Sequence, residues 1–160
     1  MPEVAERQPY TAYAQIVATF AGGLAAAGAL AKALDRDPPC DNALDLVVLA
    51  GATFKAARTI ARDDVTSFVR APFVEGEAGT GDREEPKQTG GMEQAIGELV
   101  TCTRCVGTWA AAGLTATQII APRFGRMLTW TLAAAAANDF LQTGFAALAN
   151  KSNELEARTD

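Results

Sequence analysis

A run of 21 residues without a charged side chain, from Thr11 to Ala31, most constrains what this chain can fold into. An α-helix needs about 20 consecutive apolar residues to cross a bilayer, so this run is long enough to span one. Tyr10 and Tyr13 stand at its start, where interfacial aromatic side chains are common. Glycines and alanines gathered at 22–28 form a face that another helix can approach closely. The sequence therefore predicts a membrane-spanning helix near the start of the chain.

Three further apolar segments follow, and Pro38-Pro39 separates the first of them from the opening helix. The predicted elements are helices over about 11–34, 42–62, 95–121 and 126–150, with a flexible loop over 75–91. We expect one helical domain over residues 1–160, of the all-α class, forming a small four-helix membrane protein. A soluble α-helical bundle is the alternative, because 21% of the residues are charged and charges interrupt the second helix.

The amino-acid composition argues against several classes of function for this chain. The chain has no histidine, so Ser-His and Cys-His nucleophile pairs and His-ligated metal sites are excluded. Its formal net charge of −5 argues against nucleic acid as a partner, since phosphates attract a positive surface. Three cysteines are too few for a disulfide framework. We expect no cofactor, no metal and no nucleic acid, and the sequence favours a non-enzymatic role.

Basic residues indicate how four spanning helices would be oriented. The N-terminus, the 59–97 segment and the C-terminus would share one side. That side carries Arg7, Arg62, Arg70, Arg83, Lys87, Lys151 and Arg158, with Arg58 and Arg104 at helix ends. The opposite side carries Lys32, Arg36, Arg123 and Arg126. Because Lys and Arg accumulate in cytoplasmic loops, we predict a multi-pass protein of the cell membrane with both termini in the cytoplasm.

This topology makes a prediction about three charged side chains. Lys55 lies twelve residues after Ala43, and Asp139 lies twelve residues after Met127, so both stand about 18 Å along parallel helices. A charge in lipid is costly unless it is paired. We therefore expect Asp139 to meet Lys55, or Arg58 one turn away. In the alternative, Lys55 extends to the membrane surface and Asp139 is neutral or bonded to a threonine.

Reactive side chains gather between Glu98 and Trp109, at the start of the third helix. Cys102 and Cys105 are one turn apart, and both the helix N-terminus and Arg104 favour a thiolate there. A reversible disulfide, half of a metal site and inert packing all fit this spacing. A complete metal site is not expected, because Cys40, the third thiol, would lie across the membrane. Trp109 is interpreted as an anchor at the membrane interface.

Five motifs together resemble a known family. They are Ala52-Thr-Phe-Lys-Ala-Ala-Arg58, Asp64-Val-Thr66, Arg70-Ala-Pro-Phe73, Glu98-Leu-Val-Thr-Cys-Thr-Arg-Cys-Val-Gly-Thr-Trp109 and Asn138-Asp-Phe-Leu-Gln142. Over roughly residues 43–145 the chain resembles a bacterial membrane-protein family known as domain of unknown function thirteen-sixty. The motif residues outside the cysteines are Glu98, Thr101, Gly107 and Trp109. In the family a proline usually follows the first cysteine, whereas here Thr103 does.

The resemblance implies a small multi-helix membrane protein of unestablished activity, and it transfers no catalytic residue. The helix at 11–34 lies outside it, as an addition to the family core. We predict an integral membrane protein with a binding or structural role, or an accessory subunit. It would assemble through small-residue helix faces with lipid and with another membrane protein or a second copy of itself. The alternatives are a membrane thiol redox protein acting through Cys102 and Cys105, and a soluble α-helical bundle.

Overall fold

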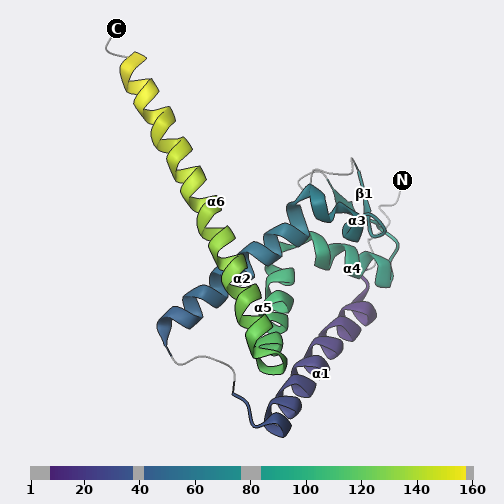
Figure 1. The fold of residues 1–160 in the computed structure, drawn as a ribbon. Coiled ribbons are helices and arrows are strands. Elements are labelled where there is room, and N and C mark those ends of the chain that lie inside the picture. The colour runs from purple at the N-terminus through teal and green to yellow at the C-terminus, as the bar shows by residue number, and fades with distance from the viewer. Residues whose placement is uncertain (1–7, 38–41, 77–83, 158–160) are drawn as a thin grey trace, which may run out of the picture.

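The computed structural model describes residues 8–37, 42–76 and 84–157, and within them the fold is helical (Figure 1). The long helices are α1 (Tyr10–Leu34), α2 (Ala43–Arg62), α4 (Met92–Thr101), α5 (Thr103–Ile120) and α6 (Pro122–Ala157). The short elements are a 3₁₀ turn η1 (Asp64–Thr66), α3 (Ser67–Arg70) and the strands β1 (Val74–Glu75) and β2 (Glu85–Pro86). The expected all-α class is confirmed.

Local signals explain where several helices begin and end. Asn42 caps α2, because its side-chain oxygen accepts the backbone N–H of Asp45 at 3.0 Å. At the end of α1, Asp35 takes a left-handed conformation with φ of 50°, and its N–H and that of Arg36 return to carbonyls of the last turn. The guanidinium of Arg36 then donates to the Ile119 and Ile120 carbonyls at 3.0 and 2.9 Å. Arg36 therefore caps the C-terminal end of α5.

Helices α2, α5 and α6 pack against one another and form the centre of the fold (Figure 1). Small side chains make this packing possible, since Ala52 and Ala61 of α2 are fully buried. A Cβ added at Gly51 would lie 3.7 Å from Ala133 of α6, and one added at Gly107 of α5 would lie 3.8 Å from Ala57. The helices thus approach through glycine and alanine faces, as in close helix pairs of membrane proteins.

Helix α6 begins at Pro122, four residues before the predicted start at 126, so the corner between α5 and α6 is short. Pro122 is the first residue of α6, a position where its missing N–H and fixed φ suit a helix. Gly125 is buried against α5, and a Cβ there would lie 2.6 Å from backbone atoms of Gln118. At the other end, α6 continues past the predicted limit of 150 to Ala157. An ion pair one turn apart, Lys151 to Glu154 at 3.0 Å, supports the extension.

The expected flexible loop over 75–91 is also corrected in part. β1 and β2 form a two-stranded antiparallel pair, with Val74 opposite Pro86. Glu84, beside β2, is buried and binds the fully buried Arg70 of α3. This polar contact joins segments distant in sequence, which composition does not reveal. Residues 77–83 of the predicted loop lie outside the described residues.

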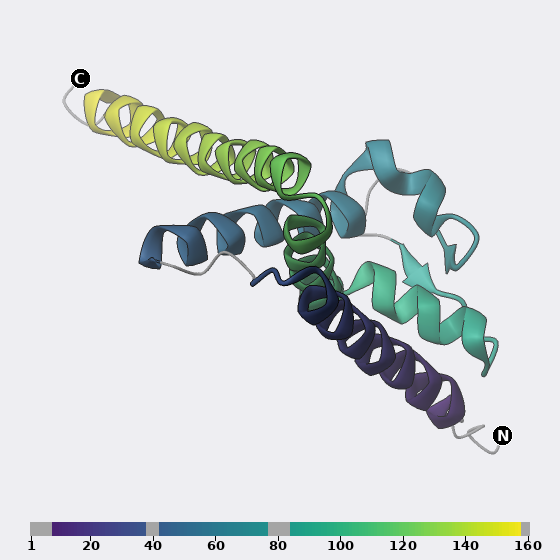
Figure 2. The same cartoon turned by 60° about the horizontal axis from the view of Figure 1, so that its bottom comes forward.

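Helix α1 lies on α4 and α5 through one side only, and most of its surface is free (Figure 2). Within the described chain, α1 alone is long and apolar enough to cross a membrane by length and composition. The four spanning helices expected from the sequence are therefore not confirmed by this criterion. Four large apolar side chains are buried: Val48, Val106, Leu114 and Ile119. By contrast, 22 large apolar side chains of the described residues are exposed.

Candidate functional site

Cys102 marks a break between two helices that the sequence predicted as one continuous helix over 95–121. Its backbone is extended, with φ of −90° and ψ of 103°, so it ends α4 and becomes the N-cap of α5. In that position its sulfur accepts the backbone N–H of Cys105 at 3.4 Å. The Cys105 thiol also donates to the Cys102 sulfur at 2.7 Å. The two thiols therefore form one hydrogen-bonded pair at the start of α5.

The pair gives its two members different acidities. Burial raises the pKa of Cys102, but the hydrogen bonds from the Cys105 thiol and from the backbone, together with the charge of Arg104, outweigh burial, and the net pKa is lowered. Burial and the hydrogen bond given to Cys102 raise the pKa of Cys105 to about 11. Cys102 is half-buried and Cys105 is exposed. The arrangement can supply one thiolate and one neighbouring thiol, which is what thiol–disulfide exchange requires.

Glu98, one turn before the break, joins α4 to α1. One carboxylate oxygen accepts the phenolic O–H of Tyr13, and the other accepts the side-chain amide of Gln94 at 2.9 Å. The oxygen of the same Gln94 side chain accepts the N–H of Gly90 at 2.9 Å. Thr101 bonds within its own helix, donating to the Gly97 carbonyl at 2.9 Å. In this structure Glu98 and Thr101 organise the helices around the cysteine turn.

The remaining motif residues pack against neighbouring helices. Gly107 faces Ala57 of α2, and a Cβ added there would make an ordinary van der Waals contact with it at 3.8 Å. Trp109 contacts Phe20 of α1 edge to face, with ring centroids 5.1 Å apart and an interplanar angle of 67°. Its role as a membrane-interface anchor stays a prediction.

The structure brings together two of the three charged residues expected to pair. Lys55 of α2 donates to the Asp139 carboxylate of α6 at 2.8 Å, and Asp63 lies 3.9 Å from the same ammonium group. Arg58 is exposed, and it lines a surface cavity together with Lys55 and Asp139. Within the described residues, however, it forms no ion pair with Asp139. The contact fixes α2 and α6 in the register that the helix lengths implied.

Sequence reasoning missed the most buried polar contact. Arg70 is fully buried and makes a two-pronged contact with Glu84, at 2.5 Å from Nε and 3.2 Å from Nη2. Its third nitrogen donates to the Ile60 carbonyl at 2.8 Å and the Asp63 carbonyl at 3.1 Å. The only signal was Arg70 itself, which the family resemblance included without a role. This contact holds α3 and Glu84, which lies beside β2, on the end of α2.

No group of three or more potential metal ligands occurs among the histidine, cysteine and acidic residues that the structure describes. Cys40, which the topology placed away from the other thiols, lies outside the described residues. The described site is therefore a dithiol next to a tyrosine–carboxylate contact.

Comparison with known proteins identifies the family. Residues 48–145 match the family described as Protein of unknown function (DUF1360). The chain belongs to this family. The matched residues run from α2 to the middle of α6, so α1 lies before them. No solved structure matches the chain.

Two relatives come from Bacillus subtilis (strain 168). Sporulation protein YjcA is 29% identical over 113 residues, which cover 64% of this chain and 91% of YjcA. UPF0713 protein YngL is 25% identical over 100 residues, which cover 62% of this chain and 77% of YngL. The family description states no activity. The physical argument for a function therefore has to come from this chain.

Proposed function

We propose that this protein is a multi-pass membrane protein with a structural or accessory role, assembling with lipid and with a protein partner. The observation that carries the proposal is the excess of exposed large apolar side chains over buried ones, 22 against four among the described residues. Monomers in water rarely expose contiguous apolar surface of this kind. Lipid tails and an adjoining helix can cover such a surface without the cost of hydration.

Helix α1 gives the strongest support for contact with lipid. Its best window has a mean hydropathy of 1.6, and none of that window is buried inside the protein. Twenty-five residues make a helix about 37 Å long, which exceeds the ~30 Å of a bilayer's apolar core. Val17 and Leu24 are more than half exposed. In a bilayer these side chains face lipid.

The second half of α6 carries a similar surface. Phe140, Leu141, Phe145 and Leu148 are each at least 64% exposed. In α5 the proposed span begins at Val106, after the charged Arg104 and the cysteine turn, so both thiols lie outside it. Only Asp139 interrupts α6 between Met127 and Asn150, and Lys55 neutralises it. Pairing of this kind is how ionisable side chains are accommodated in membrane helices.

The arrangement of α6 and the strand pair supports part of the proposed sidedness. In Figure 1 the β1 region and the end of α6 lie toward the upper part of the view, whereas the end of α1 and the α5–α6 corner lie toward the lower part. The upper group corresponds to the more basic side expected in the cytoplasm.

Alkaline carbonate extraction of membranes from cells expressing the chain tests the proposal. We expect the protein to stay in the membrane pellet and to need detergent for release, because its apolar surface has no other cover. A peripheral protein of known behaviour serves as the control for complete stripping. Recovery of the whole protein in the carbonate supernatant, followed by a monodisperse peak in plain buffer, would reject it.

A second candidate function is thiol–disulfide exchange, supported by the Cys102–Cys105 pair. The Cys102 thiolate would attack a partner's disulfide, forming a mixed disulfide and releasing one partner thiolate. Cys105, after losing its proton, would attack the Cys102 sulfur and release the second partner thiolate. The partner disulfide is reduced to two thiols, and the Cys102–Cys105 pair is oxidised to a disulfide.

Replacing the resolving cysteine tests this second function. In Cys105→Ser, the mixed disulfide cannot be resolved, so we expect a partner adduct on a non-reducing gel that disappears with reductant. Cys102→Ser removes the attacking sulfur and should give no adduct. Equal adduct formation in both variants, or in neither, would count against the exchange reaction.

A further inference from the structure

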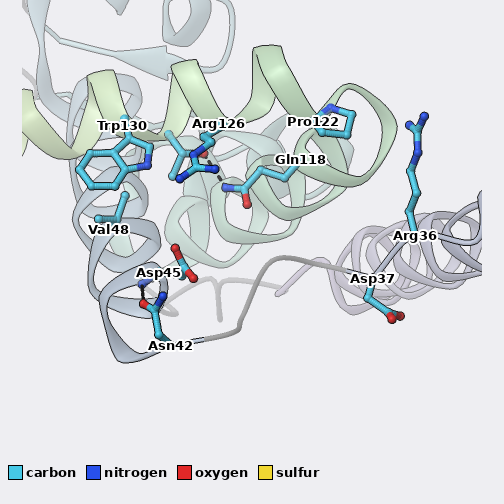
Figure 3. A pocket seen from close by; sticks show the side chains of 10 residues that line it. Arg36, Asp37, Asn42, Asp45, Val48, Gln118, Pro122, Arg126 and Trp130 are labelled. Carbon is cyan, nitrogen blue, oxygen red and sulfur yellow. Dashed lines mark hydrogen bonds between the residues drawn. The ribbon is translucent and has the colours of Figure 1, made fainter.

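A polar cavity and an apolar groove meet between α2 and α6, at the end of the core remote from the cysteine turn. The polar cavity has a volume of about 460 Å³ and lies between the first turns of α2 and α6 (Figure 3). Asp45 and Val48 line it from α2, and Arg126 and Trp130 line it from α6. Figure 3 shows these four side chains facing the same space. None of them belongs to the cysteine turn or to the Lys55–Asp139 pair.

Four charged residues line the cavity, with Arg36 and Asp37 on the α1 side and Asp45 and Arg126 on α2 and α6; the last two do not neutralise each other. Within the described residues, neither the Arg126 guanidinium nor the Asp45 carboxylate forms an ion pair. Arg36, at the edge of the cavity, is already engaged with the carbonyls of α5. Gln118 donates to Thr129 at 2.7 Å, so the polar wall between α5 and α6 is also satisfied. Two opposite charges are thus available to a ligand that carries both.

The second cavity supplies an apolar continuation. It has a volume of about 390 Å³ and runs between α2 and α6, and it shares Val48 and Trp130 with the polar cavity. Ala133, Ala134, Ala136 and Ala137 line it from α6, and Phe140 lies at its far end. From Trp130 to Phe140 the groove extends about 15 Å along the helix. A polar head and an apolar tail of one molecule can occupy the two cavities together.

We propose that this composite site binds a glycerophospholipid whose headgroup carries both a phosphate and a primary ammonium, with one acyl chain in the alanine groove. Arg126 would hold the phosphate, because guanidinium matches its oxygens in geometry and charge. Asp45 would hold the ammonium, and the Trp130 indole lies at the boundary between head and chain. A phospholipid without an amine would leave Asp45 unpaired close to its phosphate. The inference rests on the proposed membrane location and adds a specific lipid to it.

Native mass spectrometry of the full-length chain in mild detergent measures this directly. Phosphatidylethanolamine and phosphatidylglycerol with identical acyl chains are titrated separately, and the occupancy of the first bound lipid is compared. We expect phosphatidylethanolamine to bind more tightly to the wild type. Arg126→Gln should weaken both lipids by on the order of tenfold, since a charge-assisted bond is lost. Asp45→Asn should weaken phosphatidylethanolamine alone and abolish the preference.

Matched controls separate the site from general effects. Arg123→Gln removes a neighbouring charge of α6 that does not line either cavity forming the site, and it should leave both lipids unchanged. Ala137→Leu fills the groove and should weaken both lipids, whereas Ala146→Leu, on the same helix beyond the groove, should not. Helix content by circular dichroism shows that each variant is folded.

Equal binding of the two lipids to the wild type, or unchanged binding in both Asp45→Asn and Arg126→Gln, would overturn the inference. A protein that resists carbonate extraction but shows that result is a membrane protein without this lipid site. A protein that carbonate releases fails the proposed function itself. The two failures are therefore distinguished.

Discussion

At the scale of single residues, the first turn of α5 shifts the pKa values of two thiols in opposite directions. Cys102 occupies the N-cap and receives two hydrogen bonds from Cys105, while Cys105 gives its thiol proton to that contact. The pKa of Cys102 is lowered and that of Cys105 is raised to about 11. As the pH rises, Cys102 therefore ionises before Cys105. The spacing of the cysteines alone did not show which one would be the more acidic.

Alkylation rates should report this difference. The Cys102 thiolate is the reactive form, so its rate should stay near its plateau as pH falls and drop only below the midpoint of a free cysteine, about 8.5. Cys105 should react mainly at higher pH. Iodoacetamide labelling across pH 5–10, with peptides quantified by mass spectrometry, measures the midpoint of Cys102 and shows whether that of Cys105 lies above this range.

Two variants control the assignment. Arg104→Gln removes a positive charge that favours the thiolate, so the midpoint of Cys102 should move up. Chain unfolded in guanidinium should show ordinary midpoints for both thiols. A folded Cys102 that titrates at or above its unfolded midpoint would contradict the hydrogen-bonded pair.

Gly97 should be intolerant of any side chain. A Cβ there would lie 2.5 Å from the Phe73 carbonyl oxygen and 3.2 Å from Pro86, so α4 would have to move off the β1–β2 pair. We expect Gly97→Ala to destabilise the fold by about 1–3 kcal/mol, the usual cost of overpacking. Thermal unfolding in detergent, followed by circular dichroism, measures the change.

Gly113→Ala is the matched control, because nothing lies within 4 Å of the added Cβ in the middle of α5. There the better helix propensity of alanine should give unchanged or slightly higher stability, by up to about 1 kcal/mol. A Gly97→Ala protein as stable as Gly113→Ala would show that α4 does not pack on the strand pair as described.

At the scale of elements, the central contact of the structure is the one between α2 and α6. Their crossing has a close glycine–alanine contact at Gly51 and Ala133, and one turn further the Lys55–Asp139 bond. Phe54 and Phe140 stack beside this bond, with centroids 5.3 Å apart. The bond is partly screened, because the side chains are 20% and 39% exposed. Packing and charge therefore act at the same crossing.

A double-mutant cycle with Lys55→Gln and Asp139→Asn measures the charge contribution. We expect a coupling free energy of about 0.5–1 kcal/mol, in the range of partly exposed pairs. The same cycle on Lys151 and Glu154, an exposed pair within α6, should give no more than about 0.5 kcal/mol. A coupling at Lys55 and Asp139 that is zero within error would mean that packing alone fixes the register.

Much of the element order could be predicted from the sequence, because it depends on local signals. The uncharged runs predicted where the helices lie, and the equal offsets of Lys55 and Asp139 along their helices predicted that the two side chains meet. The break at Cys102 could not be predicted, since nothing in the sequence required an extended backbone there. The Arg70–Glu84 contact could not be predicted either, because it joins short elements that only tertiary packing brings together.

At the scale of the whole molecule, the proposed topology makes the two ends of the core accessible from opposite sides. Substitution of the three native cysteines by serine gives a background for single probes. An impermeant maleimide applied to intact cells should label Arg123→Cys, at the α5–α6 corner. It should label Ser152→Cys only after permeabilisation. Equal labelling of both sites in intact cells would contradict the proposed sidedness.

The buried corner at Gly125 has a mechanical consequence. Helix α6 is 36 residues long, or about 54 Å, and only its first part is held against α2 and α5. Any rotation about the Gly125–Gln118 contact is therefore magnified along a stiff arm, by about 1 Å at the tip for each degree, given that length. A force that a partner applies at the free end of α6 would therefore be transmitted to the Gly125 corner.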